Sequence, residues 1–146
     1  MSMFRSIDIS ASGLTAERLR MDVISNNIAN VNTTRTADGG PFRRKMAIFE
    51  ARHHYGQRAY QDRINPQEPG RGVRVNAIMD DMTPFKLEYD PSHPDADPDG
   101  YVRRPNIDIV HEMVDMITAT RAYEANVTCI SSSKDITNAA LNISSK

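Results

Sequence analysis

The sequence is poor in several features that mark particular classes of protein. Its 146 residues include a single cysteine, Cys129, which excludes an internal disulfide and a cysteine-cluster metal site. No run of about 18 apolar residues is present, so we expect no direct membrane insertion. The opening residues MSMFRSIDIS lack a charged stretch followed by an apolar one, so we expect no cleaved signal peptide. The formal net charge of −1 leaves no excess positive charge with which to bind nucleic acid.

Proline and glycine are nearly absent from both ends of the chain. All eight prolines and six of the seven glycines lie between Gly39 and Pro105. Because these residues break helix interiors, their distribution predicts two helical arms, residues 1–33 and 105–146, around an irregular or β-containing segment, residues 34–104. The expected fold class is mainly α with a small β-containing middle, in which the two arms together form one domain.

Both arms carry apolar residues at heptad spacing, the pattern of helices that pack along a stripe. The C-terminal arm has two such rows, interleaved at the four-and-three spacing of a coiled-coil seam. The predicted seam comprises Ile7, Leu14, Met21, Ile28, Ile109, Met113, Met116, Tyr123, Val127, Ile130 and Leu141. Polar residues interrupt these rows, and neither arm can bury its stripe alone. We therefore expect the arms to pair as a coiled-coil-like element and to complete their burial on neighbouring subunits. A self-contained helical hairpin is the alternative.

Two local signals in the arms each leave two interpretations open. Asn106 or Asp108 is expected to cap the N-terminus of the second helix. Gly13 lies inside the first helical pattern, where glycine is unfavourable. It therefore marks either a close contact with another helix or a local break.

The middle segment is expected to contain a small sheet. Residues 44–50, 72–79 and 85–89 alternate like strands. Residues 80–84 predict a hairpin connection between the second and third of them. The polar run 51–71 predicts a long loop. Three strands form only a marginal sheet without cover from a helix or a neighbouring molecule.

Charge divides the middle segment into two halves. Residues 36–75 contain eight Lys/Arg and four Asp/Glu, whereas residues 76–104 contain three Lys/Arg and seven Asp/Glu. An unevenly charged solvated surface would produce this pattern. So would attraction between the two halves, either within one chain or between copies packed head to tail.

The acidic sequence DADPDG, residues 95–100, matches the opening of a calcium-binding loop. Such a loop needs a glutamate at its twelfth position, where this sequence has Asn106. It also needs a preceding helix, which Pro91 and Pro94 exclude. We therefore expect an acidic turn rather than a metal site.

Other candidate sites also lack the constellation that their chemistry requires. The adjacent His53 and His54 point to different faces of any regular element and lack a metal-binding motif. The serines at 131–133 and Cys129 have no positioned base or oxyanion donor set. We therefore expect no catalytic residue, no metal and no cofactor, and a protein that is not an enzyme.

Specific residues carry the interpretation further than these patterns do. Residues 12–16, SGLTA, and residues 21–33, MDVISNNIANVNT, resemble the N-terminal signature of the flagellar axial proteins, the family of rod, hook and related subunits. The motif residues are Asn26, Asn27, Ala29, Asn30, Asn32 and Thr33. The continuation GGPFRRK at residues 39–45 departs from most members and resembles the proximal-rod type. Residues 89–106 and 112–127 are similar to the acidic turn and the C-terminal helix of that type.

The resemblance implies a structural subunit of the proximal rod of the bacterial flagellar basal body. Such subunits polymerise through their terminal helices into the tubular drive shaft that transmits motor torque to the hook. The implied partners are further copies of the chain, other rod subunits, the rod-base adaptor protein and the flagellar type III export apparatus. The implied location is the periplasmic part of the basal body, reached without a cleaved signal peptide. A calcium-responsive module or a coiled-coil adaptor unrelated to flagella is the alternative.

Overall fold

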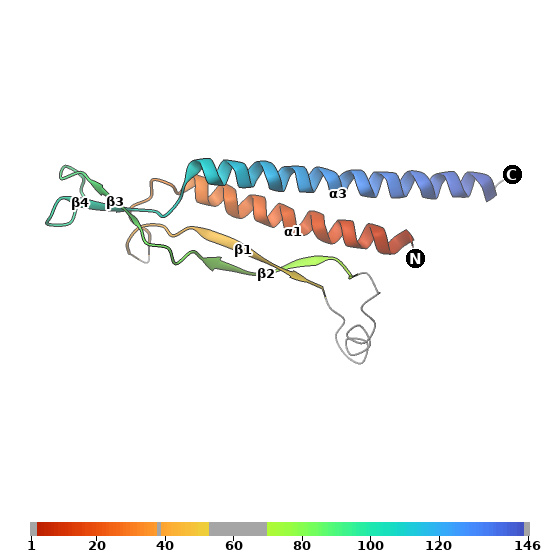
Figure 1. Cartoon of the computed structure of the whole chain (residues 1–146), viewed down its shortest axis with the longest axis horizontal. Helices are drawn as coiled ribbons and strands as arrows, with labels where there is room; N and C mark the ends of the chain where they lie inside the picture. The colour runs from red at the N-terminus through yellow and green to blue at the C-terminus, as the bar shows by residue number, and fades with distance from the viewer. Residues whose placement is uncertain (1–2, 38, 53–69, 145–146) are drawn as a thin grey trace, which may run out of the picture. The chain divides into compact units, whose positions relative to one another are not determined.

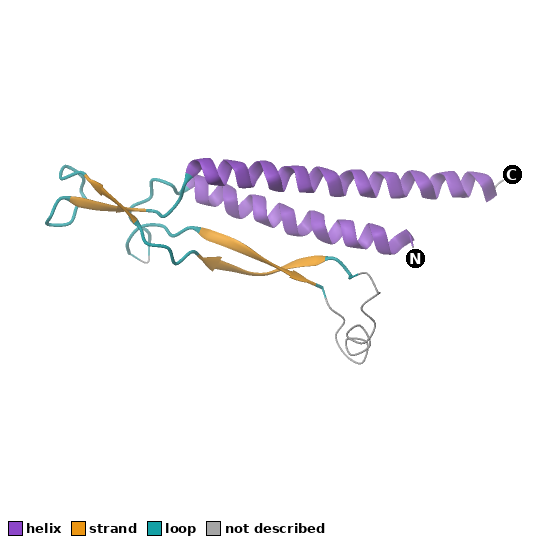
Figure 2. Ribbon diagram, in the orientation of Figure 1, coloured by secondary structure: helices purple, strands orange, loops and turns teal. Residues whose placement is uncertain are grey.

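The computed structural model describes residues 3–37, 39–52 and 70–144. Two long helices lie at the ends of the chain and four short strands lie between them (Figure 2). The elements are α1 (Met3–Ala29), β1 (Lys45–Ala51), β2 (Val73–Asp80), β3 (Lys86–Tyr89), β4 (Tyr101–Arg104) and α3 (Ile109–Ser144). The predicted fold class, mainly α with a small β-containing middle, is confirmed.

The chain forms two compact units, each assembled from distant parts of the sequence. The first, called here the terminal unit, comprises Met1–Leu19, Phe49–Asn76 and Thr120–Lys146. The second, called here the hairpin unit, comprises Arg20–Ile48 and Ala77–Ala119. Each unit contains a part of α1 and a part of α3, which lie side by side within it (Figure 1).

The hairpin unit contains most of the buried apolar side chains among the described residues. Its buried apolar side chains are Val23, Ile24, Val102, Ile107 and Ala119. Strands β3 and β4 pair antiparallel, with Glu88 opposite Val102 and Tyr89 opposite Tyr101. Because neighbouring residues of a strand face opposite sides, Val102 is buried while Tyr101 is exposed.

In the terminal unit, α1 and α3 approach closely at Gly13. The helix continues unbroken through this glycine. A Cβ atom built on Gly13 would lie 2.9 Å from Nδ2 of Asn126 on α3. Of the two interpretations of Gly13, a close helix contact is therefore the one that the structure confirms.

The strand positions agree with the sequence prediction to within one residue, but the predicted pairing is wrong. Strand β1 pairs with β2 and strand β3 pairs with β4, so residues 80–84 do not connect a hairpin. The Asp81 N–H donates to the Arg44 carbonyl, so the residue after β2 stays hydrogen-bonded to the residue before β1. The chain therefore does not turn back on β2. The predicted three-stranded sheet is replaced by two two-stranded sheets.

Strand β4 was not predicted from the sequence. It is four residues long and has one buried side chain, Val102, so it shows no alternation of apolar and polar residues. Residues 53–69 of the predicted loop lie outside the described residues.

Candidate functional site

The axial-protein motif builds the end of helix α1. The Asn30 side chain donates from Nδ2 to the Asn26 carbonyl and to Asn26 Oδ1, at 2.9 and 2.8 Å. Its Oδ1 accepts a hydrogen bond from the Thr33 hydroxyl. Ala29 is the last helical residue, and Asn32 Oδ1 accepts a hydrogen bond from Arg104 on β4. The side chains of Asn26, Asn30, Asn32 and Thr33 thus take hydrogen-bond partners within the chain at the end of α1.

Asn27 is the buried member of the motif, with 1% of its surface exposed. Its side-chain amide pairs with the peptide group of Lys45 as a neighbouring strand would. Nδ2 donates to the Lys45 carbonyl at 2.8 Å, and Oδ1 accepts from the Lys45 N–H at 2.9 Å. Nδ2 also donates to Oε2 of Glu112 at 3.0 Å. One side chain on α1 thus joins the first residue of β1 to α3.

Glu112 is fully buried and is held by Asn27 and Arg44. The Arg44 Nε donates to Glu112 Oε1 at 2.6 Å. Burial by itself lowers the pKa of Arg44, but the hydrogen bond and the negative charge of Glu112 outweigh it, so that this pKa is raised. Asp115 and Asp81 also contact the guanidinium, at 3.3 and 3.6 Å. We call Asn27, Arg44 and Glu112 the polar clasp of the hairpin unit.

The charged halves of the middle segment meet within one chain at Arg43 and Arg44. Arg43 donates to the Asp81 carbonyl at 2.8 Å and stacks on the Phe85 ring, 4.2 Å from its centre. Arg44 forms its 3.6 Å ion pair with the Asp81 carboxylate. The Thr83 N–H donates to the same carboxylate and holds the pKa of Asp81 below its ordinary value. The sequence left open whether the basic and acidic halves attract each other within one chain or between copies. At Arg43 and Arg44 the structure shows a contact within one chain.

Asp108 caps the N-terminus of α3. Its carboxylate accepts a hydrogen bond from the Val110 N–H at 2.9 Å, and this bond lowers the pKa of Asp108. Asn106, the other candidate, has a different role: it accepts from the Arg44 N–H and donates to the Thr83 hydroxyl. It fixes the chain that enters α3 against the segment that follows β2.

In the terminal unit, Ser12 joins α1 to the start of β2. This residue is buried, and its hydroxyl donates to the Ile9 carbonyl and accepts from the Val73 N–H at 3.1 Å. Gly72 lies beside it with a φ of +96°, a backbone conformation that favours glycine. A Cβ atom on Gly72 would clash with the side-chain oxygen of Ser12. Ser12 therefore anchors the start of β2 on α1.

Within a single chain, the predicted seam residues divide into two groups. The half-buried group is Ile7, Leu14, Met21, Ile28, Met116, Tyr123 and Ile130. The exposed group is Ile109, Met113, Val127 and Leu141, each with 44% to 63% of its surface accessible. Their participation in contacts between subunits stays a prediction.

The row of α3 that contacts α1 beside Met116 and Tyr123 contains small and polar residues. In the hairpin unit these are Glu112 and Ala119, both fully buried. In the terminal unit they are Asn126, beneath Gly13, and Ser133, whose hydroxyl lies 3.4 Å from that of Ser6. Two members of this row, Glu112 and Asn126, each precede by one residue a predicted seam residue, Met113 and Val127. Apolar periodicity could not find it, because its members are not large and apolar.

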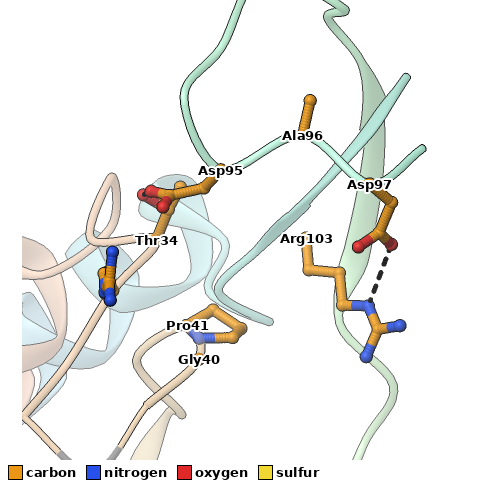
Figure 3. Close-up of a pocket in the computed structure, with 8 residues that line it drawn as sticks. Thr34, Gly40, Pro41, Asp95, Ala96, Asp97 and Arg103 are labelled. Atoms are coloured by element: carbon orange, nitrogen blue, oxygen red, sulfur yellow. Dashed lines mark hydrogen bonds and ion pairs between the residues drawn. The ribbon is translucent and has the colours of Figure 1, made fainter. Parts of the chain in front are cut away.

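The acidic sequence at residues 95–100 forms part of the connection between β3 and β4, and two of its carboxylates take partners within the chain. Asp95 accepts from the Thr34 hydroxyl at 2.8 Å, and Asp97 pairs with Arg103 at 3.6 Å (Figure 3). A shallow hollow of about 380 Å³ lies here, lined by Thr34, Arg35, Gly40, Pro41, Asp95, Ala96, Asp97 and Arg103. Among the described residues, no three His, Cys, Asp or Glu side chains gather in a group that could hold a metal ion.

Comparison with known proteins agrees with the resemblance carried by the motif. Residues 7–35 match the family described as flagella basal body rod protein, and residues 99–143 match the family described as flagellar basal body rod FlgEFG protein C-terminal. The flagellar basal-body rod protein FlgC of Borreliella burgdorferi is 52% identical, with 98% of each chain covered. FlgC of Bacillus subtilis is 42% identical over 98% of this chain and 99% of its own. FlgC of Salmonella typhimurium is 35% identical over 93% of each chain.

The chain belongs to the FlgC family of flagellar basal-body rod proteins. As an FlgC-family protein it is a structural component of the bacterial flagellar basal body, not an enzyme, and it associates with other rod components. Within the part of the chain that the structure describes, no helix has the length and apolar character to cross a membrane. The motif residues predicted from the sequence are those that shape the end of α1 and hold β1. Arg44 and Glu112, the charged members of the polar clasp, were not among the predicted site residues.

Proposed function

We propose that the chain is a subunit of the proximal rod that polymerises through its terminal helices into the tubular drive shaft of the flagellum. The two arms, residues 1–33 and 105–146, together form its assembly domain. The observation that carries this proposal is the set of apolar side chains that α3 leaves exposed. These are Ile109, Val110, Met113, Val114, Ile117, Val127, Ile136, Leu141 and Ile143.

Covering these side chains would supply a large part of the free energy of assembly. Full burial of an apolar side chain of this size contributes about 1.5–3 kcal/mol. Since each is already partly covered by its own chain, burial by a neighbour contributes about 1 kcal/mol per residue. The nine residues together correspond to several kcal/mol for each subunit added, even after the cost of ordering side chains at an interface.

The proposed location is the periplasmic part of the basal body, reached through the flagellar type III export apparatus without a cleaved signal peptide. The proposed neighbours are further copies of the chain in a helical assembly, other rod subunits and the rod-base adaptor protein. A head-to-tail contact between copies builds an open helical filament when its rotation does not close into a ring, and this is the symmetry that a rod requires.

The test replaces exposed apolar residues of α3 with glutamate. Met113→Glu and Leu141→Glu place a charge in the proposed interface, whereas Ser132→Glu introduces the same side chain at an exposed polar position of the same helix. We chose exposed positions because changes at the half-buried Met116 or Tyr123 would also disturb the single chain. A strain that lacks its own subunit receives each variant, and we measure motility, the yield of basal bodies and the amount of subunit exported.

We expect both interface variants to abolish motility and basal-body assembly while their export continues. The Ser132→Glu control should restore both, because glutamate is well tolerated on an exposed helix surface. Normal rods in strains that carry Met113→Glu and Leu141→Glu would contradict assembly through this surface of α3.

A further inference from the structure

In the hairpin unit, α3 turns polar and small side chains inward and large apolar side chains outward. Glu112 and Ala119 have no exposed surface. Met113 and Ile117, on neighbouring turns of the helix, are 55% and 53% exposed. Burial alone favours the opposite choice, because covering apolar surface is favourable whereas covering a charged carboxylate is costly. The orientation of α3 about its own axis is therefore not set by apolar burial.

A competing orientation of α3 lies one residue away. Successive residues of an α-helix are about 100° apart and about 1.5 Å along the axis, so a movement of that size would carry Met113 to the place of Glu112. Glu112 would move to the place of His111, which is exposed, and its carboxylate would reach water. The heptad row that contains Met113 would then face α1, as the apolar periodicity of the sequence predicts. The amino-acid pattern alone therefore favours the rotated helix.

The polar clasp opposes this rotation. Arg44 donates to one carboxylate oxygen of Glu112 at 2.6 Å, and Asn27 donates to the other at 3.0 Å. Both donors lie outside α3, on α1 and immediately before β1, so the helix cannot turn without breaking both hydrogen bonds. While Arg44 is present, rotation would also deprive its guanidinium of the closest carboxylate. A buried ion pair adds little net stability over apolar side chains of similar size, but in some proteins it selects one packing arrangement.

We propose that the polar clasp positions the assembly surface: it holds α3 in the orientation that buries Glu112 and keeps the apolar residues on the other side of the helix available to a neighbouring subunit. The chain thereby leaves Met113 exposed instead of burying it against its own α1. Asn27, Arg44 and Glu112 are positioning residues, because they act through the orientation of the helix. The use of the exposed side in assembly rests on the proposed rod function, whereas the orientation of α3 within one chain does not depend on it.

Methionine-methyl NMR of the purified full-length chain, with a soluble nitroxide that broadens the signals of exposed methyl groups, tests the orientation. Arg44→Leu combined with Glu112→Ala removes both charges of the clasp and leaves only a small side chain to be buried against α1. We expect this double variant to retain its helicity in circular dichroism. The broadening of the Met113 methyl signal should fall by at least about threefold, because the rotated helix covers a side chain that is 55% exposed in the structure. Arg74→Leu is the control: it removes an arginine that pairs with Glu50, where the two side chains are 42% and 39% exposed, and should leave the broadening unchanged.

An unchanged Met113 signal in the double variant would overturn the proposal, and so would a loss of helicity, because each result would show that no second folded orientation competes with the observed one. An equal change in Arg74→Leu would overturn the role of the clasp. These results can be obtained whether or not the chain builds a rod, so they are distinguishable from a failure of the glutamate variants. In a strain that lacks its own subunit, the double variant should be exported but should restore neither motility nor basal bodies. Normal rods built from a chain whose Met113 is covered would overturn the link between helix orientation and assembly.

Discussion

Asn27→Asp is the smallest change that attacks the polar clasp, because it replaces one donor group by an oxygen. The amide nitrogen of Asn27 lies 3.0 Å from a carboxylate oxygen of Glu112. Two full negative charges at that distance repel by about 5 kcal/mol at an effective dielectric constant of about 20. The introduced carboxyl avoids this repulsion by staying protonated. Keeping the proton at pH 7 costs about 4 kcal/mol of folding free energy for a carboxyl with an ordinary pKa near 3.9. Loss of the hydrogen bond to the Lys45 carbonyl adds about 1 kcal/mol.

The expected loss of unfolding free energy is therefore about 5 kcal/mol at pH 7, and it depends on pH in a defined direction. Repulsion raises the pKa of the introduced carboxyl in the folded chain above its value in the unfolded chain. The folded state then binds more protons, so the loss shrinks as the pH falls, by about 1.4 kcal/mol per unit. At pH 5 the loss should be about 2 kcal/mol.

Urea unfolding followed by far-ultraviolet circular dichroism at both pH values measures these losses against the unmodified chain. Asn26→Asp is the matched control: it is the neighbouring residue, it is exposed, and its Oδ1 accepts a hydrogen bond that aspartate can also accept. We expect the control to cost less than about 1 kcal/mol, from a negative charge near a helix C-terminus. Equal losses in the two variants, or a loss at residue 27 that does not change with pH, would refute this account of the clasp.

Two further predictions concern the anchor of β2 and the acid sensitivity of the hairpin unit. Gly72→Ala should destabilise the terminal unit by about 2 kcal/mol in thermal unfolding, since it combines a left-handed backbone with a contact on Ser12. Gly70→Ala, where a Cβ atom meets nothing within 4 Å, should change it by less than about 0.5 kcal/mol. Because the hydrogen bond from Thr83 lowers the folded pKa of Asp81, its contribution to stability is present above about pH 4 and is lost as the pH falls through the folded pKa. Asp81→Asn, which keeps an acceptor for Thr83 but does not titrate, should therefore lose less of its urea midpoint between pH 7 and pH 3 than the unmodified chain; equal losses would show that Asp81 is not involved.

The sequence was sufficient for the features that depend on local chemistry. The absence of proline from both ends predicted the two helices, and the alternation of the middle predicted three strands to within one residue. Asp108 was one of two candidate caps, and both were reasonable because Asn106 also has a capping side chain. Asn106 instead binds Arg44 and Thr83, which are distant in the sequence and come close to it only in the folded chain.

The polar clasp and the strand pairing could not be read from the sequence because they depend on contacts between distant residues. Glu112 lies in the first turn of α3, where a negative charge is favourable and the side chain normally stays in water. Nothing in its neighbourhood along the chain indicates that it is fully buried. Similarly, residues 80–84 have the composition of a turn, but Arg44 and Asn106 hold this segment in place and prevent one.

The exposure of apolar side chains along α3 has a calorimetric consequence. Unfolding raises the heat capacity of a protein in proportion to the apolar surface that becomes hydrated. Side chains such as Met113, Val114 and Ile117 are more than half exposed in the single chain, so they contribute little to that increment when it unfolds. If neighbouring subunits cover them in the rod, the corresponding decrease in heat capacity belongs to the association step. The stability of the rod would then depend on temperature with more curvature than that of its isolated subunit.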